Sequence, residues 1–386
     1  MSEQAPGRES FSLLGGPLHR LGCRLHLVRG GTNTLALGFA ISLLLWGVLV
    51  ALAFIDGTGR QLFSLAAIGG HVRLLLVIPL FFLCESLLDP KMTAFVRTIV
   101  DSGVVPRSAW PVLEAEVARI GRWKDSWLPD TLCLAAAVAL LLAAPMAHLP
   151  GAPYHPAAAE ATLAGQWYLG VCLTLFRFLV LRWLWRLALW YGFLWRVSRL
   201  SLNLVPTHPD GAAGLGYLEV VHAHFTPLVF ALSAVETASF AEGIATGRTT
   251  LEALYPALAI VLVADALLFV MPLLIFAPRL WACRVKGLGD YTTLAARYVG
   301  GFDRKWLAAD SRDDKALLGT PDLQSLADLA NSFNIVRNMR WTPISRRLLF
   351  GLALATLLPM VPLLLLAYPI AELAEIFFTK LMGLRA

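Results

Sequence analysis

Charged residues are scarce in this chain of 386 residues. Only 15% of the residues are Asp, Glu, Lys or Arg, whereas 58% are hydrophobic. Soluble domains carry about 25% charged residues, so the composition excludes an ordinary soluble protein. A charge at the centre of a bilayer costs several kcal/mol, and a membrane environment therefore explains the deficit.

Catalytic sequence motifs are also missing. The chain has no Walker A loop, no G-x-S-x-G elbow, no H-E-x-x-H motif and no kinase signature. Its five cysteines show no metal-site or redox spacing, and we expect them to be small buried apolar side chains. We therefore predict no cofactor and do not expect an enzyme.

Long apolar runs are abundant. A spanning helix needs roughly 20 apolar residues, and the fold class predicted is all-α, a polytopic transmembrane bundle of about seven spans. A re-entrant hairpin is the alternative for the second span. The predicted spans are Thr34–Ile55, Val72–Leu88, Thr131–Leu149, Trp167–Trp185, Gly216–Phe240, Ala253–Ala277 and Leu348–Tyr368.

The basic residues indicate an orientation. If the N-terminus is cytoplasmic and each span changes the side, 26 of the 32 Lys and Arg residues lie inside and four lie outside. Cytoplasmic loops are enriched in Lys and Arg, so we predict a multi-pass protein of the bacterial inner membrane. The same rule explains the net charge of +6 without nucleic acid.

This topology divides the chain into six parts. The last part ends in an amphipathic segment, Ile370–Leu384, expected to lie in the outer interface. The parts are a cytoplasmic segment (1–33), two spans (34–88), cytoplasmic amphipathic helices (89–127), four spans with a THPDG loop at 207–211 (128–278), a cytoplasmic helical region (279–347), and the last span with its interfacial helix (348–386).

Three helices outside the apolar cores are predicted by their patterns. Val112, Leu113, Val117 and Ile120 form an apolar stripe that is typical of an amphipathic helix. In the cytoplasmic region, one helix is expected near Tyr291–Tyr298 and another from about Asp322. The sequence Trp167–Leu202 should form one helix of about 54 Å, which exceeds the bilayer thickness.

The fifth span carries a polar stripe. On one continuous helix, five polar side chains share an arc of about 100° over about 26 Å. Such a stripe cannot face lipid. It forms either interhelical hydrogen bonds or one wall of an aqueous or proton-conducting path. The five residues are Glu219, His222, Thr226, Ser233 and Glu236.

Two opposite charges fall at similar depth near the middle of the membrane. Arg177 lies in the fourth span and Asp265 in the sixth. Because an unpaired charge there is costly, we predict an Arg177–Asp265 ion pair, with Glu236 as the rival partner of Arg177.

The loop before the fifth span reads LVPTHPDGAAGLG. Its Pro and Gly residues favour a rigid turn, in which His208 and Asp210 would cap the next helix. A metal held by His208, Asp210, His222 and His224 is the alternative. However, His222 and His224 lie about 200° apart on a helix, where they cannot chelate one ion.

Three ionisable residues of the second span share one helix face. They are His71, Glu85 and Asp89. Glu85 and Asp89 lie near its inner end, where a solvated helix end is the simplest interpretation. Alternatively they pair with Arg182 or Arg186, or ring an inner vestibule of an oligomer.

Two segments carry a resemblance. They are THPDGAAGLGYL at Thr207–Leu218 and GTPDLQSLADLANSFNIVRNMR at Gly319–Arg340, followed by a proline-rich last span. From Trp183 to its end the chain resembles a group of uncharacterised bacterial inner-membrane proteins. The resemblance implies a bacterial inner membrane and brings no activity.

The function expected from these features is that of a channel or transporter. The protein would be a homo-oligomer that moves ions, protons or a small solute along span five, with a possible protein partner at 279–347. One alternative is a membrane-embedded enzyme acting on a lipid or quinone at the inner interface. The other is a non-catalytic scaffold or sensor.

Overall fold

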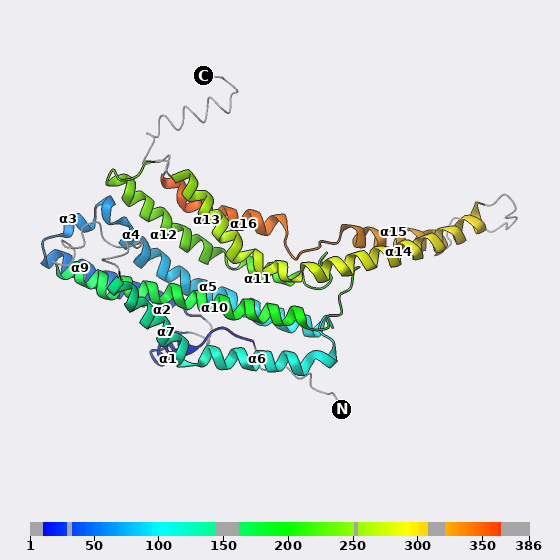
Figure 1. Cartoon of the computed structure of the whole chain (residues 1–386), viewed down its shortest axis with the longest axis horizontal. Coiled ribbons are helices and arrows are strands. Elements are labelled where there is room, and N and C mark those ends of the chain that lie inside the picture. The colour runs from blue at the N-terminus through cyan, green and yellow to red at the C-terminus, as the bar shows by residue number, and fades with distance from the viewer. Residues whose placement is uncertain (1–10, 29–32, 144–161, 251–253, 308–320, 364–386) are drawn as a thin grey trace, which may run out of the picture.

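The fold is built from helices. The computed structural model in Figure 1 describes residues 11–28, 33–143, 162–250, 254–307 and 321–363. Every regular element in these ranges is a helix, which confirms the predicted all-α class. The predicted interfacial helix at Ile370–Leu384 lies outside the described residues.

Five helices are long and apolar enough to cross a bilayer, and two bent helix pairs also pass if each counts as one span. The chain is therefore a multi-span membrane protein. The five are Leu35–Ile55, Leu65–Asp101, Leu163–Arg199, Tyr217–Ala245 and Arg346–Leu363. The pairs are Arg107–Asp125 with Trp127–Ala143, bent by 46°, and Tyr255–Phe269 with Met271–Trp306, bent by 43°.

The second span is a full helix of 37 residues and not a re-entrant hairpin. A short 3₁₀ turn and α4 lead into a π-helical segment and then into α5. The fourth span likewise has a π-helical segment between α9 and α10. The bounds are α4 Ile68–His71, π-helix Val72–Val77, α5 Ile78–Asp101, α9 Leu163–Trp167, π-helix Tyr168–Leu173 and α10 Thr174–Arg199. The fourth span thus confirms the long helix predicted from Trp167.

Helix breaks explain most differences from the predicted spans. The third span is α7, which begins at Trp127 after the extended residue Ser126. The sixth span breaks at Val270, followed by Pro272, because proline has no N–H for the helical hydrogen bond. The remaining bounds are α1 Gly16–Arg24, α2 Leu35–Ile55, α3 Gly59–Leu62, α6 Trp110–Asp125, α7 Trp127–Ala143, α11 Tyr217–Ala223, α12 Thr226–Ala245, α13 Leu254–Phe269 and α16 Arg346–Leu357.

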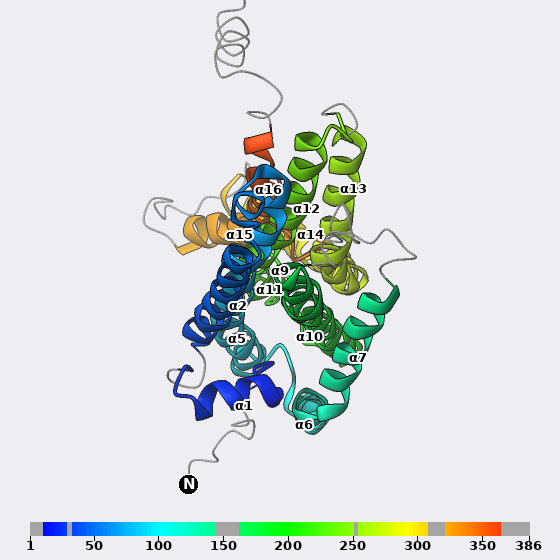
Figure 2. The same ribbon diagram turned by 90° about the vertical axis from the view of Figure 1, so that its left-hand side faces the viewer.

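A helical hairpin extends beyond one end of the bundle. It consists of α14 (Ala277–Trp306) and α15 (Pro321–Asn338), which run side by side (Figure 1), and in Figure 2 it lies behind the bundle. Tyr298 Oη donates to the carbonyl of Asp322 at 2.9 Å, and Lys305 Nζ lies 2.6 Å from the Asp322 carboxylate. The helix predicted from Asp322 is confirmed, whereas the predicted helix at Tyr291–Tyr298 is part of the longer α14.

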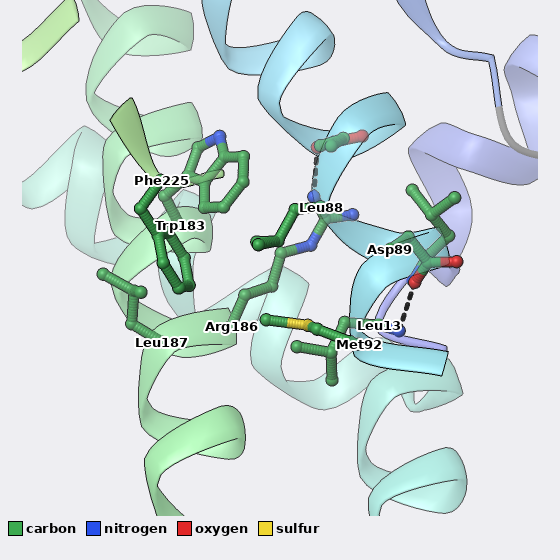
Figure 3. Close-up of a pocket in the computed structure, with 10 residues that line it drawn as sticks. Leu13, Leu88, Asp89, Met92, Trp183, Arg186, Leu187 and Phe225 are labelled. Carbon is green, nitrogen blue, oxygen red and sulfur yellow. Dashed lines mark hydrogen bonds and ion pairs between the residues drawn. The ribbon is translucent and has the colours of Figure 1, made fainter. Parts of the chain in front are cut away.

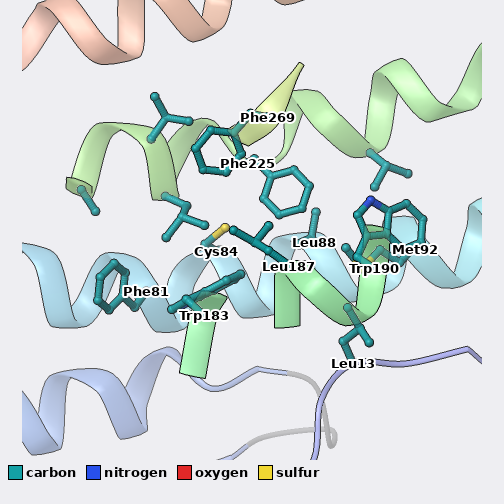
Figure 4. Close-up of a cluster of buried hydrophobic side chains, with 14 of the residues drawn as sticks. Leu13, Phe81, Cys84, Leu88, Met92, Trp183, Leu187, Trp190, Phe225 and Phe269 are labelled. Carbon is teal, nitrogen blue, oxygen red and sulfur yellow. The ribbon is translucent and has the colours of Figure 1, made fainter. Parts of the chain in front are cut away.

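The core lies between α5, α10 and the α11–α12 unit (Figure 4). Its large side chains include Phe81, Trp190, Phe225 and Phe269, each no more than 1% exposed. The helix α2 packs on α5 at Gly38, where an added Cβ would lie 2.8 Å from the Phe82 side chain. The α5–α10 pair is thus enclosed, and it carries the charged residues described next.

Candidate functional site

A cluster of buried charges lies between α5 and α10, on the side toward the hairpin. Arg186 is ion-paired with Glu85 (Figure 3). Arg182 lies 3.7 Å from Glu85 and 3.7 Å from Asp130 of α7. Glu85, Arg182 and Arg186 are each at most 7% exposed. We call Glu85, Asp89, Asp130, Arg182 and Arg186 the hairpin-side cluster. The prediction that Glu85 and Asp89 lie at a solvated helix end is therefore wrong. The alternative, an ion pair of Glu85 with Arg182 or Arg186, is confirmed, and both arginines take part.

Asp89 is used differently, since it holds the N-terminal segment. Its carboxylate accepts the backbone N–H groups of Leu13 at 2.7 Å and Leu14 at 3.2 Å, and the Ser12 hydroxyl at 2.9 Å. Arg182 Nη2 donates to the carbonyl of Gly15 at 2.8 Å. We call residues 11–15 the N-terminal strap.

A small cavity lies beneath the strap. Its volume is about 20 Å³, enough for about one water molecule. Within the described chain, Arg186 Nη2 is buried and has no hydrogen-bond partner. The lining consists of Leu13, Leu14, Glu85, Leu88, Asp89, Met92, Trp183, Arg186, Leu187 and Phe225.

A second polar cluster lies farther from the hairpin, between the same two helices and α12. Arg73 is 3% exposed and donates to Tyr168 Oη at 2.8 Å and to Ser239 Oγ at 3.2 Å. Glu236 and Glu242 both attract Arg73 electrostatically, and Glu242 accepts the Gly69 N–H at 2.7 Å. With Arg177, which lies close enough to Arg73 for repulsion, these residues form the far-side cluster.

The far-side cluster is built on two π-helical segments. Arg73 lies in one and Tyr168 in the other, so the bonded pair joins two local distortions. Such segments are rare and occur frequently at functional sites. They release backbone groups and redirect side chains, which places a guanidinium against a hydroxyl in an otherwise apolar interface.

Arg177 does not form the predicted ion pair. In the described part of the chain, both of its terminal nitrogens are buried without a hydrogen-bond partner. Asp265 instead accepts a hydrogen bond from Thr356 Oγ1 of α16 at 2.8 Å. The similar depth predicted for Arg177 and Asp265 therefore did not make them partners.

An aromatic layer separates the two clusters. The Phe81 ring lies 6.2 Å from the Phe176 ring and 6.4 Å from Trp183, measured between centroids. Phe81 lies eight residues after Arg73 and four before Glu85 along one helix. Arg73 and Glu85 are thus about 18 Å apart along this helix, and apolar rings lie between them.

The polar stripe of the fifth span does not form one wall. The helix is interrupted at His224 and Phe225, so the periodicity assumed for an unbroken helix does not hold. Ser233 Oγ bonds to the carbonyl of Thr356 at 2.5 Å, Thr226 Oγ1 is exposed and bonds to Ala223, and Glu236 belongs to the far-side cluster. Interhelical hydrogen bonding therefore accounts for Ser233, and Glu236 alone of the stripe joins the clusters.

His222 is a core residue. It is fully buried, its Nδ1 lies 2.8 Å from the carbonyl of Phe269, and Trp190 Nε1 donates to its Nε2 at 3.4 Å. His71 is likewise engaged, because Trp46 Nε1 donates to its Nδ1 at 3.0 Å and its Nε2 lies 2.8 Å from the carbonyl of Leu62. Both rings link helices or turns.

Asp210 organises the THPDG loop. Its carboxylate accepts the N–H groups of Ala212, Gly214 and Gly216, at 2.8 Å for the first and third. Partial burial alone would raise the pKa of Asp210, but these N–H groups and His208 together hold it below its usual value. Asp210 thus binds the residues just before α11, whereas the prediction placed it as a cap of the helix itself.

The two sequence segments that carry the resemblance meet at this loop. Arg340 donates to Glu219 Oε2 at 2.7 Å and to the carbonyl of Asp210 at 3.0 Å, and its N–H bonds to Gly211. Ser345 Oγ also bonds to Glu219. The base of the hairpin is therefore fastened to the bundle by Arg340 and Glu219.

The four residues of the metal alternative lie in separate environments. His208 pairs with Asp210 at 2.8 Å, His222 is buried in the core, and His224 is half-buried and bonds to the carbonyl of Val220. Among the residues that the structure describes, no group of three or more His, Cys, Asp or Glu side chains is arranged to hold a metal ion.

Several residues of both clusters were missed from the sequence. Arg182 was predicted as an alternative partner of Glu85, but Arg73, Tyr168, Ser239, Asp130 and the strap were not predicted as site residues. An arginine inside a predicted span is itself a signal that could have identified Arg73, because such a charge requires a buried partner. The π-helical segments have no comparable sequence pattern.

No protein-family model, curated protein or solved structure matches this chain. The resemblance to bacterial inner-membrane proteins therefore stays a prediction. What helix length and hydropathy establish is a polytopic helical membrane protein.

Proposed function

We propose that the protein is a transporter or channel that moves an ion, a proton or a small charged solute along the α5–α10–α12 interface. One observation carries the proposal, namely the two buried charged clusters separated by aromatic rings within a single interface. Buried charges are costly in a membrane and mark transport paths when they face the interior of a bundle. The path differs from the expected one, because span five contributes Glu236, Ser239 and Glu242 to it and not the whole predicted polar stripe.

Arg177 is the member of the far-side cluster that lies nearest in sequence to Arg182 of the hairpin-side cluster. Its unpartnered guanidinium lies one residue from Phe176 and five before Arg182 on α10. A buried donor without an acceptor costs free energy, which a passing anion or a rearranged carboxylate would recover. The aromatic layer would then close the path when no charge is crossing.

Flux through proteoliposomes tests the proposal. Arg177→Gln and Glu236→Gln should each lower proton or ion flux at least about tenfold, the effect of roughly 1.4 kcal/mol on a barrier. The matched controls are Arg97→Gln and Glu114→Gln, which alter exposed residues. Equal flux in wild type and both cluster variants, or no flux in wild type above empty vesicles, would refute the proposal.

We also propose that the protein lies in the inner membrane of a bacterium. The distribution of its basic residues then places the hairpin in the cytoplasm. Addition of a membrane-impermeant thiol reagent to intact cells tests it, since Cys23 is exposed and should stay unlabelled until the cells are opened. A homo-oligomer is also part of the proposal, and mass photometry tests it. Because Glu85 and Asp89 are buried within one chain, the path would lie inside each protomer.

A scaffold is the second candidate, and the protruding hairpin favours it. Trp281, Val285, Leu294 and Leu323 are large apolar side chains of the hairpin that are at least 45% exposed. A partner protein at 279–347 would cover them. Absence of flux, together with photo-cross-linking from Leu294 to one defined protein and not from exposed Leu44 of α2, would favour this candidate.

A further inference from the structure

The N-terminal strap is buried although it forms no regular element. Phe11 is 2% exposed, and its ring lies 4.6 Å from Phe193 and 5.7 Å from Trp190, between centroids. Leu13 and Leu14 are 6% and 7% exposed. The strap therefore lies in the bundle and not on its surface.

The strap is held by the charged cluster that it covers. Asp89 accepts two of its backbone N–H groups and the Ser12 hydroxyl, and Arg182 donates to the Gly15 carbonyl. Thr93 Oγ1 also donates to the carbonyl of Phe11. These bonds use main-chain groups, which water or a polar solute can replace one for one.

The strap also forms a wall of the cavity. Leu13 and Leu14 lie against Asp89, Met92 and Arg186, as Figure 3 shows for Leu13. Removal of these two leucines would take away part of the wall of the small cavity. The charges of Asp89 and Arg186 would then be in contact with water.

We infer that the strap is a lid on the hairpin-side cluster, and that its departure admits water and solute to Asp89 and Arg186. Only its effect on flux rests on the proposed function. Access of water and reagents to the cluster can be measured without any transported species.

A cysteine reporter in the cavity tests this inference. Met92→Cys places a thiol at a position that is 1% exposed, and the purified protein is treated with a charged maleimide and mapped by mass spectrometry. Deletion of residues 2–15, or Phe11→Ala with Leu13→Ala, should raise the labelling rate of Met92→Cys at least about tenfold. That factor corresponds to about 1.4 kcal/mol less free energy for local opening.

Two controls make the result decisive. Ala355→Cys in α16 is 4% exposed and should label equally slowly with and without the strap, and Phe39→Ala changes an exposed ring of α2 and should leave Met92→Cys protected. Unchanged labelling of Met92→Cys in the strap variants would overturn the inference. If the deletion also accelerates Ala355→Cys, the double point variant decides, since it retains the chain. Accelerated labelling without flux in any variant would refute the transport proposal and leave the lid.

Discussion

Removing the carboxylate of Glu85 should be among the most destabilising single changes in this protein. The side chain of Glu85 is 5% exposed, and the side chains of its partners Arg182 and Arg186 are 5% and 8% exposed. Opposite charges about 4 Å apart attract by about 4 kcal/mol at an effective dielectric constant near 20. Most of this attraction offsets desolvation, but loss of one partner leaves the others buried and uncompensated, which costs about 3–5 kcal/mol.

The two arginines should respond unequally. After loss of Glu85, Arg182 still has Asp130 at 3.7 Å, whereas the ion-pair partner of Arg186 is Glu85 itself. We therefore expect Glu85→Leu to lower the free energy of unfolding by about 3–5 kcal/mol. Glu85→Leu combined with Arg186→Met should cost less than Glu85→Leu alone, because the uncompensated charge is then gone.

Unfolding by SDS in mixed micelles, followed by circular dichroism, measures these differences. Exposed Glu114→Leu in α6 is the control and should stay within about 0.5 kcal/mol of wild type. The reasoning is refuted if the double variant is as unstable as the sum of the single variants, since coupled neighbours should interact by about 0.5–3 kcal/mol.

Three further predictions concern the THPDG loop and the hairpin. Gly214→Ala should destabilise the protein by about 1–3 kcal/mol in the same SDS titration, because the φ of Gly214 is +98° and an added Cβ would lie 2.5 Å from Val104. Gly289→Ala in α14 is the control and should be neutral or stabilising, because an added Cβ there meets nothing within 4 Å. Asp210→Asn should destabilise the protein at neutral pH, and unfolding titrations should show this effect fading below about pH 4. Folding lowers the pKa of Asp210, so its stabilising contribution is present above the unfolded pKa near 3.9 and is lost as pH falls through the folded pKa. An effect that is constant from pH 7 to pH 3 would contradict this. Arg340→Gln should increase hydrogen–deuterium exchange in residues 207–218 while exchange in α10 stays unchanged, and equal protection of the loop would show that Arg340 does not hold it.

The sequence determined the elements that depend on local composition. Apolar length predicted the membrane spans, and the absence of breakers predicted the long helix from Trp167 to Leu202, which in the structure ends at Arg199. The start of α15 near Asp322 followed from its proline. These features depend on residues within one or two turns of each other, which is the range over which sequence patterns are informative.

Tertiary structure decided which polar groups meet. Arg177 and Asp265 were predicted at similar depth but have no bond to each other, whereas Glu85 pairs with Arg182 and Arg186 because α5 and α10 pack together. Rotation of one helix by a single residue, about 100°, moves a side chain to another neighbour. The break at His224, just before Pro227, and the two π-helical segments add such rotations, and the π-helical segments have no comparable local pattern.

The strap shows the largest difference between what the sequence predicts and what the tertiary structure decides. In the sequence it is a short run of small and apolar residues before α1, without periodicity or motif. Only the folded bundle brings Asp89 and Arg182 to its backbone, because main-chain N–H and C=O groups are present in every residue and carry no sequence signal. The chain itself thus determined that it spans a membrane, and the packing of its helices decided which charges are buried together and what covers them.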